Sequence, residues 1–357
     1  MSGDRIEWID TMRGIGILIV VYGHNQLEPL PSKYLQLMMV PLFFFASGMV
    51  FSPGKYQNYW AFFKRRFRGL VVPYLVFSVV GWLFWIALWA WNVFVQGQPR
   101  PAMLVGALAP VIGIPTGIAK FMPYNLALWF LTCLFVTDSL FYLLQRRVKT
   151  DLGLLLWMAF FAVVGFAVGK RLFLPLLWNF DTALAVMIYY GAGYLLRKNW
   201  GVRFEFKWWI MIILAAAFLA VSVYLTTLNP QTHLKENELG KFHLFHLISI
   251  TGLVFFIFLA QLLARVRAIG WLGRNTLPLL GMHFVTMTVF HMLIRGVFGL
   301  DFWQHRATTP WALFWGTGTL LLIIPCIFLF NRYLPWAVGR TKPKMKSEKF
   351  EMKNETA

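Results

Sequence analysis

Residues 208–227 read WWIMIILAAAFLAVSVYLTT, a run of twenty residues that contains no charged side chain. Because an α-helix rises 1.5 Å per residue, a helix of this length crosses the ~30 Å hydrocarbon core of a membrane. The run is too long and too continuously apolar for a barrel strand, which spans ~10 residues of alternating character. The segment therefore predicts a membrane-spanning helix.

The rest of the chain repeats this pattern. Of its 357 residues, 59% are hydrophobic and only 13% are charged, a composition that excludes a water-soluble fold. We expect an all-α fold, a polytopic integral membrane helical bundle of about ten transmembrane helices. The expected spans are 11–27, 35–52, 70–95, 124–144, 151–169, 180–196, 208–227, 243–264, 276–298 and 310–334.

Basic residues predict the orientation of these spans. With the N-terminus in the cytoplasm, 24 of the 33 Lys and Arg residues fall in cytoplasmic segments, as the positive-inside rule requires. Both termini are then cytoplasmic. Residues 1–340 are expected to form one transmembrane domain, and residues 341–357 a basic, disordered tail that lies against anionic lipid. The connection 96–123, which is rich in Gly and Pro, would be an interfacial or re-entrant lid, or a plain loop.

Two other classes of partner are not expected. The formal charge of +19 does not indicate nucleic-acid binding, because the basic residues separate the apolar runs instead of gathering on one surface. The two cysteines each lie alone within an apolar run, which leaves no disulfide framework and no Cys-based zinc module. We expect no metal cofactor.

Polar residues inside the first span are the strongest candidates for chemistry, because hydrocarbon excludes them unless they pair or face water. On a helix, Arg13 and His24 fall within ~20° of each other and Asp10 lies ~60° from Arg13, so all three share one stripe. Arg13 and His24 are ~16 Å apart along the axis. A long molecule with an anionic end, such as coenzyme A, would bridge them. The alternative is that Arg13 snorkels to lipid phosphate and His24 bonds a neighbouring helix.

Two further groups are weaker candidates. Arg65 and Arg68 precede Pro73 and share a helical face suited to phosphate, although basic clusters are common at cytoplasmic helix ends. Asn275 is a candidate N-cap for a helix that carries Pro278 in its first turn and His283 about two turns in. Asp138 and Asp181 are also expected inside the membrane, where either would orient an imidazole or neutralise an arginine.

These motifs together resemble the membrane-bound acyltransferase 3 family. The family signature, a basic residue and a histidine separated by ten positions, matches Arg13 and His24. Further similar segments follow in the family's order. They are PLFFFASG at 41–48, the pair Arg65 and Arg68 before Pro73, LWFL at 128–131, and GRNTL at 273–277 leading to His283. The chain is most similar to stand-alone members related to fucose 4-O-acetylases and to acetylases of enterobacterial surface polysaccharides.

The resemblance implies transfer of an acyl group, usually acetyl, from cytoplasmic acyl-CoA to a sugar hydroxyl of a cell-surface or exported glycan at the bacterial inner membrane. His24 would be the general base or a transient acyl acceptor. Arg13, Arg65 and Arg68 would hold the phosphates of acetyl-CoA, and Asp10 would hold Arg13 in register. Ser47 and Asn275 would bind the oxyanion or the sugar, and His283 is a secondary candidate.

Two other functions fit the same polar residues. A transporter or flippase would use them to move a glycan or glycolipid without acylating it. A scaffolding subunit of a polysaccharide export machine would not need His24 for acylation at all. The expected phosphate-binding positions on the cytoplasmic side argue against the transporter.

Overall fold

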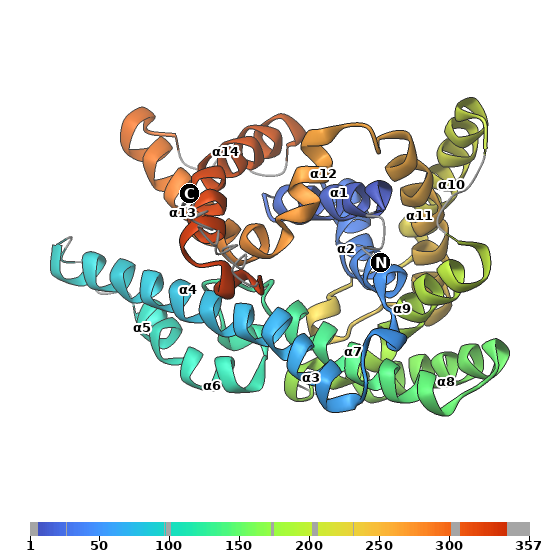
Figure 1. Ribbon diagram of the computed structural model, residues 1–357. Helices are drawn as coiled ribbons and strands as arrows, with labels where there is room; N and C mark the ends of the chain where they lie inside the picture. Colours follow the sequence, from blue (N-terminus) through green and yellow to red (C-terminus); the bar gives the residue numbers. More distant parts are fainter. Residues whose placement is uncertain are drawn as a thin grey trace, which may run out of the picture.

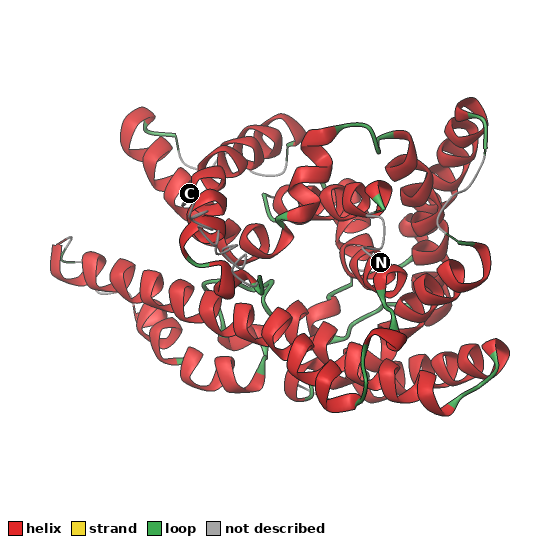
Figure 2. Cartoon of the chain, in the orientation of Figure 1, coloured by secondary structure: helices red, strands yellow, loops and turns green. Residues whose placement is uncertain are grey.

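The computed structural model describes residues 6–25, 27–95, 97, 101–172, 175–201, 206–230, 232–300 and 308–340. Within these residues the chain is built of helices and no strand occurs (Figure 2). An isolated bridge pairs His233 with Glu238. The all-α prediction is confirmed, whereas the predicted tail 341–357 lies outside the described residues.

Each of the ten expected spans overlaps one long helix. In chain order these are α1 (Glu7–Gly23), α2 (Pro29–Val50), α4 (Val72–Ala90), α7 (Trp129–Arg147), α8 (Asp151–Gly169), α9 (Phe180–Trp200), α10 (Trp208–Leu228), α11 (Phe242–Leu262), α13 (Thr276–Phe298) and α14 (Thr309–Tyr333).

By length and composition alone, seven helical segments in the described residues are long and apolar enough to cross a membrane. The other three long helices are α1, α7 and α9, which carry the buried carboxyl groups of Asp10, Asp138 and Asp181. A buried carboxyl group is tolerated inside a bilayer only where protein partners surround it. We conclude that the carboxyl groups of α1, α7 and α9 are stabilised by contacts with the other helices of the bundle.

The third span is longer than expected. It runs as one helical segment over Tyr59–Val95, through α3 (Tyr59–Arg66), a π-helical turn η2 (Phe67–Val71), α4 and a second π-helical turn η3 (Trp91–Val95). Asn58 caps its start, because its side-chain oxygen accepts a hydrogen bond from the Ala61 N–H at 2.9 Å. The basic cluster before Pro73 therefore lies within a helix.

The connection after this span forms two short helices, α5 (Pro101–Leu108) and α6 (Pro110–Thr116), followed by η4 (Ala119–Phe121). Both helices begin at a proline, which suits the first helical position because its missing N–H is not needed there. Trp82 Nε1 donates to Ala107 O at 2.7 Å and Tyr74 Oη donates to Ile114 O at 2.7 Å, so the pair packs on α4. Val105 and Val111 remain exposed, as expected for a pair of helices at the membrane interface.

Helix α1 lies in the interior of the bundle, in contact with α2, α11, α13, α14 and the short helix α12 (Arg267–Arg274) (Figure 1). Its approach to α12 is set by two glycines. A Cβ atom added at Gly273 would lie 1.7 Å from Asp10 O, and one added at Gly14 would lie 2.0 Å from Ile269 O. Backbones this close require glycine, as in other membrane helix contacts.

Candidate active site

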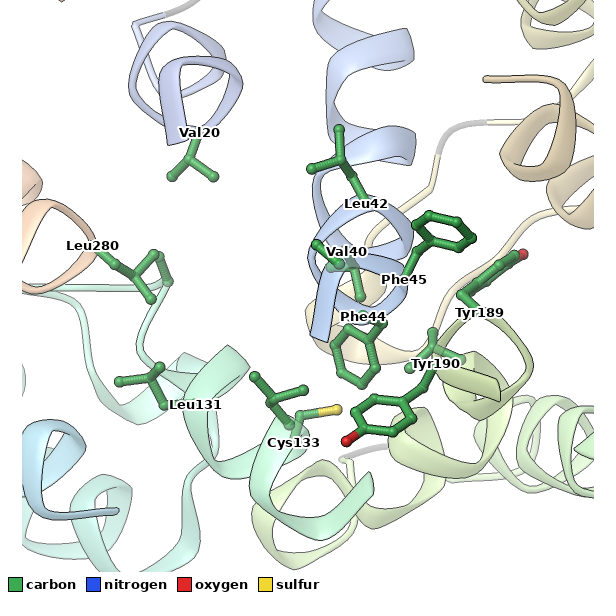
Figure 3. Close-up of a cluster of buried hydrophobic side chains, with 14 of the residues drawn as sticks. Val20, Val40, Leu42, Phe44, Phe45, Leu131, Cys133, Tyr189, Tyr190 and Leu280 are labelled. Atoms are coloured by element: carbon green, nitrogen blue, oxygen red, sulfur yellow. The ribbon is translucent and has the colours of Figure 1, made fainter. Parts of the chain in front are cut away.

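A cavity of about 250 Å³ lies between α1, α2, α7, α13 and the turn η2. Figure 3 shows the side chains of Val20, Val40, Leu131 and Leu280, from four different helices, arranged around it. Most of its lining is apolar, and the polar side chains are few. They are Arg13, Ser47, Arg66, and Thr276 at the start of α13. An apolar pocket with a few polar groups is typical of a small-molecule site.

Two arginines face this cavity, Arg13 from α1 and Arg66 from the end of α3. Arg66 forms an ion pair with Asp138 of α7, in which both Nη2 and Nε of the guanidinium approach Oδ2, the latter at 2.5 Å. The Asp138 side chain is fully buried and that of Arg66 is 28% exposed. Of the two buried aspartates left open by the sequence, Asp138 therefore neutralises an arginine.

Arg65 and Arg68, the arginines predicted to hold phosphate, are both exposed and neither lines the cavity. They share a face of the helix, but this face points away from the cavity. Arg66 lies ~100° around the helix from Arg65 and faces the cavity. Arg66 and Gly69 both line the cavity. Arg65 and Arg68, their neighbours in sequence, therefore lie next to the cavity without lining it.

Two histidines meet at the other end of α1. His24 is the C-cap residue of α1, and His283 lies on α13 with 1% of its surface exposed. Their ring centroids are 5.2 Å apart, and both rings pack on Phe284, at 4.8 Å and 4.5 Å respectively. The structure therefore brings together the two histidines that the sequence places 259 positions apart.

The hydrogen bonds of the pair determine which ring nitrogen is basic. Nδ1 of His24 lies 2.6 Å from Val20 O, and Nδ1 of His283 lies 2.8 Å from Leu280 O. A carbonyl oxygen can only accept, so each Nδ1 carries the proton in the neutral ring and each Nε2 keeps a lone pair. Both imidazoles are thus held in the tautomer that can take a proton at Nε2.

The same two carbonyls join the histidines to the cavity. Val20 and Leu280 both line it, and each lies one helical turn from its histidine. His24 and His283 are themselves not among the lining residues. The cavity thus ends one turn short of the imidazole pair, with Arg13 at its other end.

Asn125 is a residue of this site that the sequence reasoning missed. Its fully buried amide donates to Gly281 O at 2.9 Å and to Leu280 O at 3.2 Å. Leu280 O thus accepts hydrogen bonds from both Asn125 and His283, which fixes the turn of α13 that carries the imidazole. A buried asparagine at the start of an apolar span is the signal that would have found it.

Ser47 lines the cavity, at the level of Arg13 and not of His24. The register of α1 against α2 shows this, because Gly16 meets Leu42 and Phe43 while Gly23 meets Met39. Position 47 therefore lies beside the arginine end of α1. Its hydroxyl is placed to contact a ligand in the cavity at a distance from the imidazole pair.

Asn275 and Asp10 lie outside the cavity lining. Asn275 occupies the predicted N-cap position of α13, but its side chain makes no capping bond. Its Nδ2 donates instead to Trp271 O at 2.8 Å, and its Oδ1 accepts from Asn331 Nδ2 at 2.8 Å and from Arg340 Nη2 at 3.1 Å. Asp10 is 8% exposed and its backbone packs on Gly273. Asn275 thus joins the start of α13 to α12, to α14 and to the chain after α14.

In a comparison with protein families, residues 6–330 match the acyltransferase domain of the acyltransferase 3 family. The match covers α1 to α14 almost completely, including the cavity and both histidines. Neither the comparison with curated proteins nor the comparison with solved structures gives a match. The chain is therefore an integral membrane protein that belongs to the membrane-bound acyltransferase 3 family.

Proposed function

We propose that the protein is an O-acyltransferase of the bacterial cytoplasmic membrane that moves an acetyl group from cytoplasmic acetyl-CoA to a sugar hydroxyl of a surface or exported glycan. The family supports acyl transfer in a membrane. The observation that carries the rest is the cavity, which has two arginines at one end and an imidazole pair one turn beyond the other. Such a site suits a donor with a charged end and a distant reactive end.

Coenzyme A meets both requirements. Its thioester is joined to its phosphates by the long pantetheine arm, and the eleven residues from Arg13 to His24 span ~16 Å of helix. Arg13 and Arg66 would bind the anionic end that enters the cavity, since planar guanidinium groups suit phosphate. Arg65 and Arg68, exposed on the same stretch of helix, would meet the phosphates that stay at the cytoplasmic surface. Ser47 would hydrogen-bond the arm.

His24 would act as the general base. Its Nε2 takes the proton of the sugar hydroxyl as the oxygen attacks the thioester carbonyl carbon, and the carbon–sulfur bond then breaks. The proton on Nε2 passes to the departing thiolate, which leaves as the free thiol of coenzyme A. This assistance is typically worth ~10²–10⁴-fold in rate. In the alternative route, His24 first takes the acyl group itself and then passes it to the sugar.

His283 would support this step. Its imidazole packs beside that of His24, with its own Nε2 lone pair and with Nδ1 fixed by Leu280 O. It would accept a hydrogen bond from the acceptor hydroxyl or from protonated His24. The role proposed for His283 is therefore to orient the reacting groups.

The experiment uses the purified full-length protein with acetyl-CoA labelled in its acetyl group. The wild type should bind the coenzyme and release its thiol when acceptor glycan is added, whereas a transporter would do neither. His24→Ala should lower thiol release by at least ~10²-fold. His243→Ala is the matched control, because this exposed histidine on α11 lies outside the cavity lining and should leave the rate unchanged.

The same variants can be tested in cells by mass spectrometry of the surface glycans. Loss of an acetyl mass in His24→Ala cells, with the protein still present in the membrane, supports the proposal and identifies the acceptor. Unchanged acyl content in those cells would instead support a scaffolding subunit. This measurement also distinguishes acetyl from other acyl groups.

A further inference from the structure

A second, larger cavity of about 630 Å³ lies on the face of the bundle opposite the predicted cytoplasmic side, and we call it the outer cavity. It is formed by η4, by the end of α8 and the chain after it, and by the connection between α10 and α11, which contains η6 (Leu234–Glu236). Its charged lining residues are Lys120, Lys170, Lys235, Glu236 and Glu238. The mechanism proposed above uses none of them.

The η6 connection is held in a fixed shape by buried polar groups. Asn237, at a φ of 55°, donates to Gly165 O at 2.8 Å and to Asp181 Oδ2 at 3.0 Å. Asn179 Nδ2 donates to Lys235 O at 3.2 Å. Asp181, the other aspartate whose role the sequence left open, therefore fixes this connection. The side chain of Lys235 thus projects from a rigid backbone.

The three lysines come from three separate segments of the chain. Lys120 lies on η4, Lys170 follows α8 and Lys235 lies on η6, yet all three line one cavity. Basic residues are uncommon on this side of the membrane, which holds nine of the 33 Lys and Arg residues in the predicted topology. The convergence of three of these nine on one cavity indicates an anionic ligand.

The formal charge of the cavity lining is positive. Lys235 lies 3.8 Å from Glu236, and the Lys170 ammonium lies 4.6 Å from the centroid of the Phe166 ring. Three ammonium groups outnumber the two carboxylates of Glu236 and Glu238. The carboxylates would accept hydrogen bonds from hydroxyl groups, so the cavity suits a ligand that carries both hydroxyls and a negative charge.

Hydrogen bonds place this cavity at the end of α1 that carries His24. Lys33 of α2, nine residues after His24, donates to Asn229 O, and Asn229 Nδ2 donates to Leu239 O, a residue that lines the cavity. The connection between α10 and α11 therefore lies at the same end of the bundle as His24. A ligand held in the outer cavity would approach the end of α1 at which His24 lies.

From this arrangement we infer that the outer cavity binds the acceptor, and that the acceptor is an acidic saccharide whose carboxylate or phosphate contacts Lys120, Lys170 and Lys235. The inference rests on the proposed function, since it gives the class of substrate for the same reaction. One hydroxyl of the bound sugar would face His24 Nε2. Charge-assisted hydrogen bonds from the lysines would then supply both affinity and orientation.

Binding of three simple sugars to the purified full-length protein tests the inference. Glucose is neutral, glucuronate carries a carboxylate, and glucose 1-phosphate carries a phosphate. We expect at least one of the two anions to bind about tenfold more tightly than glucose, as hydrogen bonds to charged groups require. A preference for glucuronate identifies a uronic acid in the acceptor, and a preference for glucose 1-phosphate identifies a phosphate.

The variant Lys170→Gln/Lys235→Gln should remove this preference for the anion. Lys241→Gln is the matched control, because Lys241 is an exposed lysine of the same connection that does not line the cavity. Unchanged binding of acetyl-CoA to the double variant shows that it is folded. Equal affinity for all three sugars, or no binding of any, overturns the inference, as does full retention of the preference in the double variant.

These outcomes are separate from a failure of the proposed function. Lysine-dependent binding of the anionic sugar without any thiol release from acetyl-CoA would retain the anion site and refute acyl transfer to it. Thiol release with a neutral glycan, unaffected by the lysine changes, would retain the acyltransferase and refute the acidic acceptor.

Discussion

Arg66 contributes a positive charge to the cavity and is held there by its ion pair with Asp138. Asp138 is fully buried, and its charge is compensated by a guanidinium that is itself partly exposed. Removal of one partner from such a pair leaves an isolated charge in an apolar interior, which costs about 3–5 kcal/mol. Replacement of both partners by apolar residues is often close to neutral.

We therefore expect Arg66→Met to lower the free energy of unfolding by about 3–5 kcal/mol, and Arg66→Met/Asp138→Leu to recover most of that loss. Neither variant should transfer acetyl groups at the wild-type rate, because both lack the guanidinium that lines the cavity. Thermal unfolding in detergent and thiol release measure the two effects separately.

Arg65→Met serves as the control for both measurements. Arg65 is exposed, so its loss should change stability by no more than about 1 kcal/mol. If the double variant regained both stability and full activity, Arg66 would have a purely structural role and the proposed contact with the coenzyme would be wrong.

The eleven-residue spacing predicted that Arg13 and His24 follow one stripe of α1. In the structure Arg13 lines the cavity, whereas His24 does not and lies one turn beyond Val20, which does. Spacing could not tell which face of α3 is buried, so Arg66 was overlooked between Arg65 and Arg68. Asn275 was placed correctly before α13, but its contacts with Asn331 and Arg340 come from distant parts of the chain.

At the scale of elements, the contact between α1 and α12 holds the arginine end of the site in place. Gly273 packs directly on the backbone of Asp10, three residues before Arg13. Backbone atoms cannot rotate away as a flexible side chain can, so an added methyl group must separate the two helices. Steric exclusion of any side chain thus explains why glycine occupies the first position of the GRNTL segment.

Gly273→Ala should therefore destabilise the protein by about 1–3 kcal/mol, the usual cost of overpacking, and should raise the KM for acetyl-CoA by displacing Arg13. Thermal unfolding in detergent and steady-state kinetics test both effects. Gly296→Ala is the control, because a Cβ atom at this exposed position of α13 would meet no atom within 4 Å. Equal stability of the two variants would contradict the proposed role of this contact.

The existence of each long helix was predictable from the sequence, whereas some boundaries were not. Apolar runs predicted a long helix in each of the ten places, because a long helix is the structure that satisfies every backbone group inside a membrane. Helix α1 ends at Gly23 and not at residue 27, and the third span extends back to Tyr59. The two π-helical turns in that span have no pattern in the sequence that predicts them.

At the scale of the whole molecule, the helices that carry buried carboxyl groups differ in exposure from the apolar helix α10. The α10 helix exposes Trp208, Ile213 and Tyr224, as a lipid-facing helix does, whereas α1, α7 and α9 keep their carboxyl groups buried. In the predicted orientation, Arg13 and Arg66 of the first cavity lie toward the cytoplasm, and the second cavity is formed by connections on the opposite side. The proposed donor and acceptor would then enter from opposite sides of the membrane.

Labelling with a membrane-impermeant maleimide tests that orientation. The native cysteines provide a low background, because Cys133 is buried and Cys326 is half-buried. In right-side-out vesicles we expect Arg171→Cys, beside the outer cavity, to react at once, and Lys55→Cys, on the predicted cytoplasmic side, to react only after the membrane is permeabilised. Both positions are exposed, so a difference in their labelling reports the side of the membrane and not burial. The reverse pattern would place the arginine-lined cavity outside, where no acyl-CoA is available, and would refute the proposed direction of acyl transfer.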